Sequence, residues 1–180
     1  MKGIVFTEFM EMVEASFGFS VANRLVQETN PASGGVYTAI GTYDHKEIVA
    51  FVIKLSEISE ISVPDLLRTF GNYLFNTFTL TRNELFQKNG NTLSFLESVE
   101  GYIHVEVLKL YPKAELPRFV TKRLSDTSIE MIYNSDRAMW PLAEGLIQGC
   151  AHYYGEQVTI KTDLLKSDGS QVKFLIDLVQ

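Results

Sequence analysis

The spacing of the hydrophobic residues changes at Pro117, and this change constrains the fold more than any other feature of the chain. Before Pro117, apolar residues recur at intervals of three and four, as in an amphipathic helix, first at Phe6, Phe9, Met10, Val13 and Phe17. After Pro117, Ile129, Met131 and Tyr133 alternate with other residues, as in a strand with one buried face. The sequence therefore predicts an α+β fold, with a helical N-terminal part followed by a C-terminal antiparallel sheet.

Capping residues and prolines divide the N-terminal part into separate helices. Asp44, with Glu47 three residues later, resembles a capping box, and Pro64 suits the first turn of the next helix. We expect helices over 3–17, 21–27, 45–55 and 64–78, and a longer helix over 96–111 that Pro112 ends. This last helix carries His104.

The C-terminal part predicts a meandering sheet with one inserted helix. We expect strands near 118–124 and 129–133 around a turn at 125–127, and then a helix from Pro141 to about Tyr154. A hairpin of 158–160 and 172–176 around Ser167-Asp168-Gly169-Ser170 completes the sheet. No repeat or linker divides the chain, so residues 1–180 are expected to form a single domain.

Composition excludes several classes of protein. The net charge is −6 and no run of Lys and Arg occurs, so we expect no nucleic-acid partner. Cys150 is the only cysteine, which excludes an internal disulfide and an iron–sulfur cluster held by this chain alone. The N-terminus does not resemble a signal peptide, and no apolar run reaches the roughly 20 residues that span a bilayer. We therefore expect a cytoplasmic protein without membrane attachment.

Two groups of residues are candidates for binding. Tyr133, Ser135 and Arg137 stand at alternate positions, which on a strand would place two hydroxyls and a guanidinium on one face, suited to an anion. The alternative is a solvated strand end whose Arg137 pairs with a surface Glu. His104, on an apolar helix face, offers a nitrogen to a metal, and its alternative is a core histidine bonded to a carbonyl. A carboxylate clamp and one imidazole together suit a haem held without a covalent link.

The chain resembles the haem nitric oxide/oxygen-binding (H-NOX) family in its stand-alone bacterial type, which is related to the haem domain of soluble guanylate cyclase. The matching blocks begin at Met1-Lys2-Gly3-Ile4-Val5 and cover nearly the whole chain. They continue, with matching order and spacing, through residues 70–75, 103–112, 116–117, 133–137 and 143–146.

The resemblance implies haem b (iron protoporphyrin IX), buried between the helical part and the sheet. It implies that His104 is the proximal iron ligand and that Tyr133, Ser135 and Arg137 hold the haem propionates. Pro117 matches the proline that bends the porphyrin out of plane. Val5 and Leu146 match apolar positions that pack on the macrocycle.

The distal side implies which gas binds. Oxygen-binding members carry a tyrosine five residues after the motif arginine, where this chain has Leu142. Leu74, Phe9 and Phe78 are expected to complete an apolar wall, which offers no hydrogen bond to bound O2. We therefore expect binding of NO and CO without a stable O2 complex. An O2-binding haem sensor stays the alternative, because Trp140, Tyr153 or Tyr154 could supply a donor.

The resemblance also implies a sensor rather than an enzyme. We find no nucleophile–base pair or nucleotide-binding motif, and a haem enzyme would need distal acid–base groups that Leu74 and Leu142 do not provide. The segment 162–170 lacks the cysteines that bind zinc in some relatives, so we expect no zinc. Relatives of this type act on a separate histidine kinase or cyclic-di-GMP enzyme. A partner in trans is therefore expected, signalled by release of His104 when NO binds.

Overall fold

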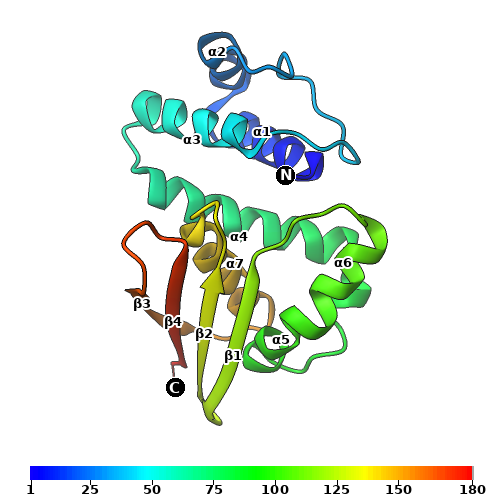
Figure 1. Ribbon diagram of the computed structural model, residues 1–180, viewed down its shortest axis with the longest axis vertical. Helices are drawn as coiled ribbons and strands as arrows, with labels where there is room; N and C mark the ends of the chain where they lie inside the picture. The colour runs from blue at the N-terminus through cyan, green and yellow to red at the C-terminus, as the bar shows by residue number, and fades with distance from the viewer. Residues whose placement is uncertain (180) are drawn as a thin grey trace.

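The computed structural model describes residues 1–179 and has the α+β architecture predicted from the sequence (Figure 1). The N-terminal part contains α1 (Gly3–Phe17), α2 (Phe19–Thr29), α3 (His45–Ser59) and α4 (Val63–Thr81). A middle segment follows with η1 (Asn83–Leu85), α5 (Thr92–Ser98), η2 (Val99–Ile103) and α6 (His104–Leu110). The C-terminal part contains β1 (Arg118–Ser125), β2 (Ser128–Asn134), α7 (Trp140–Tyr153), β3 (Val158–Leu164) and β4 (Gln171–Leu178).

The helix starts follow the expected capping chemistry. The Asp44 side chain accepts a hydrogen bond from the backbone N–H of Lys46 at 2.9 Å and caps α3. Ser62 caps α4 by accepting from the N–H of Asp65. The helix therefore begins at Val63, one residue before the expected start, and Pro64 lies in its first turn. Both helices therefore begin within a residue or two of the predicted positions.

The helix that carries His104 is not regular, in contrast to the prediction of one longer helix over 96–111. α5 passes into a π-helical turn, η2, and α6 then begins at His104 itself. In this turn the Glu100 side chain accepts a hydrogen bond from the backbone N–H of Phe119 on β1, at 3.1 Å. Such a wide turn depends on contacts with other elements of the fold. The spacing of apolar residues within 96–111 therefore could not predict it.

The sheet is not a meander. Its strands are antiparallel and lie in the order β1-β2-β4-β3, so β4 pairs with β2 and β3 lies at an edge. β4 buries alternate residues, Val172, Phe174 and Ile176, whereas β3 is largely exposed. The chain therefore passes through α7 to the outer edge and returns with its apolar strand on the inside, because β4 has a fully buried face and β3 does not.

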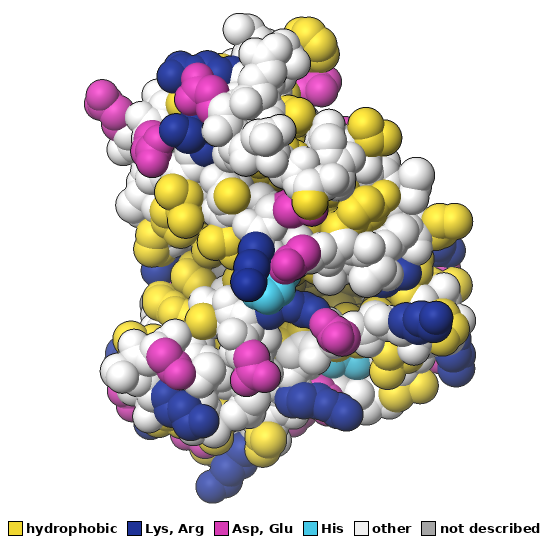
Figure 2. Space-filling view, turned by 45° about the horizontal axis from the view of Figure 1, so that its top comes forward, with side chains coloured by type: hydrophobic (Ala, Val, Ile, Leu, Met, Phe, Trp, Pro, Cys, Tyr) yellow, Lys and Arg dark blue, Asp and Glu magenta, His cyan; other side chains and the backbone are white. Residues whose placement is uncertain are grey.

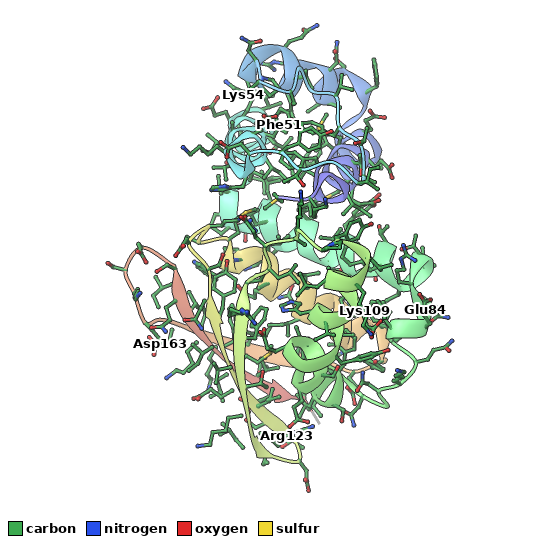
Figure 3. The ribbon with its side chains drawn as sticks, turned by 45° about the vertical axis from the view of Figure 1, so that its right-hand side comes forward. Phe51, Lys54, Glu84, Lys109, Arg123 and Asp163 are labelled. Atoms are coloured by element: carbon green, nitrogen blue, oxygen red, sulfur yellow. The ribbon has the colours of Figure 1, made fainter. Side chains whose placement is uncertain are left out.

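Two hydrophobic cores lie on either side of α4. One core is formed by α1, α2, α3 and α4, with Phe6, Phe9, Phe51 and Phe70 completely buried. The other core joins α5, α7 and the sheet to the far side of α4. Figure 1 shows α4 running between the N-terminal helices and the layer of α7 and the sheet, and Figure 3 shows side chains around Phe51 filling the space between the N-terminal helices.

Glycines bring α4 and α7 into backbone contact. A Cβ atom built on Gly145 would lie 2.1 Å from the backbone oxygen of Arg68, and one on Gly71 would lie 2.2 Å from that of Leu142. Both distances are impossible for a real side chain, so the close approach of the two helices requires glycine at these positions. The ion pair of Arg68 with Glu144, with Nε–Oε2 at 2.8 Å, joins the same two helices.

No helix within residues 1–179 has the length and apolar character needed to cross a membrane. On the face drawn in Figure 2, the Lys and Arg side chains are scattered among Asp and Glu and leave no continuous basic surface.

Candidate functional site

His104 lies where the middle segment meets the sheet. Its side chain is 14% exposed, and its ring centroid lies 5.8 Å from that of Phe119 on β1. Phe119 is paired with Tyr133 across β1 and β2, and these two rings are also 5.8 Å apart. His104, Phe119 and Tyr133 therefore form one connected row of rings, which brings together two residues that the sequence predicted to act at the same site.

The Glu100 carboxylate faces the Nδ1 atom of His104. The Nδ1 atom of His104 lies 3.2 Å from Oε2 of Glu100, one helical turn earlier. Burial lowers the pKa of His104 below its ordinary value, against the opposing effect of the Glu100 carboxylate. A neutral imidazole next to a carboxylate acceptor carries its proton on Nδ1, which leaves the Nε2 lone pair available to a metal.

The expected row of Tyr133, Ser135 and Arg137 along one strand face is wrong in its geometry. β2 ends at Asn134, and the chain then turns, with the N–H of Ala138 donating to the carbonyl of Ser135 at 3.1 Å. The Ser135 hydroxyl accepts from the N–H of Arg137 at 3.3 Å and fixes this turn. Residues in a turn that follows a strand can show the same alternation in the sequence as residues of the strand itself. The pattern alone therefore did not distinguish a longer strand from a turn at this point.

The three side chains nevertheless remain neighbours. Tyr133 is buried, and its hydroxyl accepts a hydrogen bond from the N–H of Met139 at 3.1 Å. Burial raises the pKa of the Tyr133 hydroxyl, and hydrogen bonding to Ser135 and Met139 and the charge of Arg137 oppose that rise. Ser135 and Arg137 therefore act on the Tyr133 hydroxyl although they do not share its strand.

Arg137 already binds a carboxylate. Its Nη1 donates to the carbonyl of Glu115 at 2.8 Å, and Nη2 donates to the carboxylate of the same residue. The Arg137 side chain is 15% exposed, whereas that of Glu115 is 82% exposed. The alternative of Arg137 pairing with a surface Glu is thus present in the structure. The guanidinium is fixed and largely buried, while its partner carboxylate is an exposed side chain.

The predicted apolar residues form a second group, on the border of the N-terminal core. Phe9 and Leu74 are buried, and Phe9 packs edge-on against Phe70 with ring centroids 5.2 Å apart. The others are half-buried, and all but Pro117 pack against the N-terminal core: Val5, Phe78, Pro117, Leu142 and Leu146. Phe78 and Leu146 also pack against the second core, so these two residues lie at the boundary between the two cores.

Of the three side chains that could have supplied a distal donor, the two tyrosines are hydrogen-bonded elsewhere. The Tyr153 hydroxyl donates to Oδ1 of Asn83 at 3.1 Å, and the Tyr154 hydroxyl donates to the carbonyl of Phe86 at 2.7 Å. The Trp140 ring is covered by the Arg68 guanidinium. The Tyr153 and Tyr154 hydroxyls therefore have other partners in this structure, whereas the contact of Trp140 with Arg68 is over its ring face.

Sequence reasoning missed three contributors to the site: Glu100, Phe119 and Glu115. The i,i+4 spacing of Glu100 and His104 could have indicated the first, since such pairs meet on a helix face. Nothing local indicated the other two, because Phe119 meets His104 where β1 packs against the start of α6, and Glu115 meets Arg137 across 22 residues.

His104 is not part of a cluster of protein metal ligands in the part of the chain that the structure describes. Within residues 1–179, no three His, Cys, Asp or Glu side chains are placed to hold a metal ion together. Two surface hollows lie away from the His104 side chain. One is lined by α1 and α2, and the other by residues of η1 and α6 that include Glu84 and Lys109 (Figure 3). A metal at His104 would therefore need most of its ligands from a cofactor.

A family model and several solved structures match this chain. The family model described as Haem-NO-binding matches residues 2–162. The structure is similar to that of an H-NOX protein from K. algicida in its unliganded Fe(II) state, with a TM-score of 0.96 and 37% identity, covering 100% of this chain and 97% of that one.

Two further H-NOX structures were determined with a bound gas. The protein from S. oneidensis, in the Fe(II)NO state, has a TM-score of 0.92 and 29% identity, with complete coverage of both chains. The protein from Shewanella woodyi, in the Fe(II)CO state, has a TM-score of 0.84 and 39% identity, covering 99% of this chain and 95% of that one. No curated protein sequence gave a significant match. The extent of the family match shows that this chain belongs to the H-NOX family of haem-binding gas-sensor domains.

Proposed function

We propose that this chain is a haem-based sensor of nitric oxide that signals to a separate partner by release of His104, its proximal ligand. The observation that carries the proposal is the pairing of His104 with Glu100, which leaves Nε2 free at one end of the ring row that leads to Tyr133. Ferrous haem b, when bound, supplies the iron to which NO or CO binds.

The residues present suit haem. His104 offers one neutral imidazole nitrogen, and Arg137 is held in a position in which it already binds a carboxylate. A haem propionate would replace the exposed Glu115 carboxylate on that guanidinium, with the hydroxyls of Tyr133 and Ser135 beside it. Val5, Leu146 and Pro117 offer apolar surface for the macrocycle, which we infer from their half-buried state and from the family.

The distal wall explains the expected gas selectivity. Phe9, Leu74, Phe78 and Leu142 carry no hydrogen-bond donor, and the Tyr153 and Tyr154 hydroxyls are bonded elsewhere. A hydrogen bond to a charged or strongly polar acceptor contributes about 1–3 kcal/mol, and bound O2 would lack it here. NO needs no such bond to bind ferrous haem, so the protein is proposed to distinguish NO and CO from O2.

Absorption spectra of the purified ferrous protein test this selectivity. We expect the Soret band to shift on addition of NO or CO, and no oxygen adduct to form in air. Leu142→Tyr should introduce an air-stable oxygen adduct, whereas Leu142→Phe, a matched change without the hydroxyl, should not. An air-stable oxygen adduct of the unchanged protein would overturn the selectivity, and failure to retain haem would overturn the whole proposal.

The signalling step predicts a change in α6. His104 is the first residue of α6, and no residue of α6 is buried, so a change at His104 can move this helix without opening either core. We expect the backbone amides of α6 to exchange their hydrogens equally fast in two samples. One is His104→Ala supplied with free imidazole as the iron ligand, and the other is the unchanged protein treated with NO. A pattern equal to that of the unliganded protein would contradict signalling through histidine release.

We also propose that the protein is not an enzyme. The side chains assigned to the distal wall contain no group that could donate or accept a proton during turnover. The partner is proposed to be a histidine kinase or a cyclic-di-GMP enzyme, as in the stand-alone relatives. We also propose haem b without zinc and a cytoplasmic location.

A further inference from the structure

The Glu100 carboxylate connects the candidate ligand to the sheet. Its Oε1 accepts from Nη1 of Arg118 at 2.6 Å, and its Oε2 accepts from the backbone N–H of Phe119 at 3.1 Å. The same Oε2 lies 3.2 Å from Nδ1 of His104. Two of these three donors belong to β1, so Glu100 is held by the strand while it faces the histidine.

We propose that Glu100 is the positioning residue of His104, fixing the imidazole with its proton on Nδ1 and its Nε2 directed to the ligand site. This inference rests on the proposed role of His104 in holding haem. A metal-binding histidine commonly donates its other N–H to a carboxylate, which fixes the ring orientation and makes the ring a stronger ligand. Glu100 has the charge and the geometry for this task.

The three donors also limit how Glu100 can move. A carboxylate bonded on both oxygens to β1 cannot rotate freely, so the direction of its bond to His104 is fixed by the strand rather than by α6. His104 is consequently connected to β1 in two ways, by ring contact with Phe119 and through Glu100. A displacement of His104 from its ligand position would therefore be transmitted to β1 as well as to α6.

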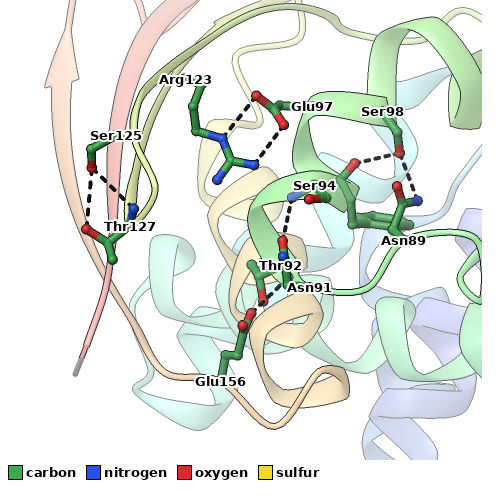
Figure 4. A network of polar contacts seen from close by, with 11 residues as sticks. Asn89, Asn91, Thr92, Ser94, Glu97, Ser98, Arg123, Ser125, Thr127 and Glu156 are labelled. Atoms are coloured by element: carbon green, nitrogen blue, oxygen red, sulfur yellow. Dashed lines mark hydrogen bonds and ion pairs between the residues drawn. The ribbon is translucent and has the colours of Figure 1, made fainter.

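Glu97 provides a matched comparison within the same segment. It also connects the middle segment to β1, by accepting from Nε and Nη2 of Arg123 at 3.1 and 2.8 Å (Figure 4). The polar contacts of Glu97 involve Arg123 and not His104. Glu97→Gln therefore removes the same charge and a comparable link to β1, without changing the acceptor at Nδ1.

Resonance Raman spectroscopy of the ferrous, unliganded haem protein tests the effect on the ligand bond. Glu100→Gln should lower the iron–histidine stretching frequency and speed the loss of haem to an acceptor protein about tenfold. Glu97→Gln should leave the frequency unchanged and the rate within twofold of the unchanged protein. Equal behaviour of the two variants, whether both change or neither does, would overturn the inference.

Nitrogen-15 NMR of the haem-free full chain gives a readout that does not depend on haem. We expect His104 to carry its proton on Nδ1 in the unchanged chain and to lose this preference in Glu100→Gln. A proton on Nε2 in the unchanged chain would overturn the inference even if haem binds as proposed. Conversely, failure to bind haem together with an Nδ1 proton would refute the proposed function and leave the positioning role intact.

Discussion

The contact of α4 with α7 and the segment from α5 to α6 are held by different kinds of interaction. At the first, glycine backbones touch, and an added Cβ at Gly145 or Gly71 would collide with main-chain atoms. In the second, no residue of α6 is fully buried, and the segment is joined to β1 by the carboxylates of Glu97 and Glu100. The comparison separates a rigid junction from a segment that can shift.

The start of the middle segment is fixed more firmly than its end. Asn91 caps α5 by accepting from the N–H of Ser94 at 2.8 Å, and Glu156 accepts from the N–H of Thr92 at 2.8 Å (Figure 4). α5 also buries Leu93, Phe95 and Leu96 in the second core. Mobility is therefore expected to begin at the π-helical turn η2 and to include His104 and α6.

The largest effect is expected from breaking the junction. Gly145→Ala places a methyl group against the backbone of Arg68 and should reduce the free energy of unfolding by about 3 kcal/mol, measured by urea denaturation. Gly101→Ala in η2 is the control. No atom lies within 4 Å of its added Cβ, so it should be neutral or stabilise by up to about 1 kcal/mol. Similar losses for both would contradict the contrast between the two regions.

A smaller loss is expected from the ion pair at the same junction. Glu144 is 8% exposed, and Arg68→Met would leave its carboxylate without the 2.8 Å bond from Nε. We expect a loss of about 2 kcal/mol, because an unpaired buried charge must be desolvated. Asp65→Asn removes the other, exposed partner of Arg68 and should change stability by less than about 0.5 kcal/mol. An equal cost for the two variants would show that burial of Glu144 does not matter.

The smallest effect is expected in the middle segment and depends on pH. The hydrogen bond from Arg123, against partial desolvation, holds the pKa of Glu97 below its ordinary value of 4.5. Its contribution is therefore complete above pH 4.5 and is lost as the pH falls through the lower folded pKa. Both side chains are substantially exposed, so Glu97→Gln should cost at most about 0.5 kcal/mol at pH 7. Unfolding curves at pH 7 and pH 3 measure this, and a cost that persists at pH 3 would rule out the ion pair as its source.

Most of the fold could be predicted from local patterns. The apolar spacing and the caps placed α1, α3, α4 and α7 within a few residues of their observed ends. The order of the strands could not be predicted, because it depends on which strand has an apolar face to bury beside β2. The π-helical turn was also missed, since its contact with Phe119 comes from another element.

The site was predicted in its composition more than in its geometry. His104 and Tyr133 were expected at one site, and Phe119 connects them. Arg137 was expected on a strand face and lies in a turn, because Ser135 bonds to its N–H. The roles assigned to these residues and to the distal wall stay predictions that the spectra described above will test.

The sequence by itself determined the α+β class, the capped helices and the residues that identify the family, because these depend on side chains at fixed spacing along the chain. Only the tertiary structure decided which carboxylate faces His104, which side chain occupies Arg137, and where glycine allows α4 to touch α7. These contacts join residues from different elements, and their geometry is set by how the two cores pack on α4. The change at Pro117 thus predicted the two parts of the molecule, and packing determined how they meet.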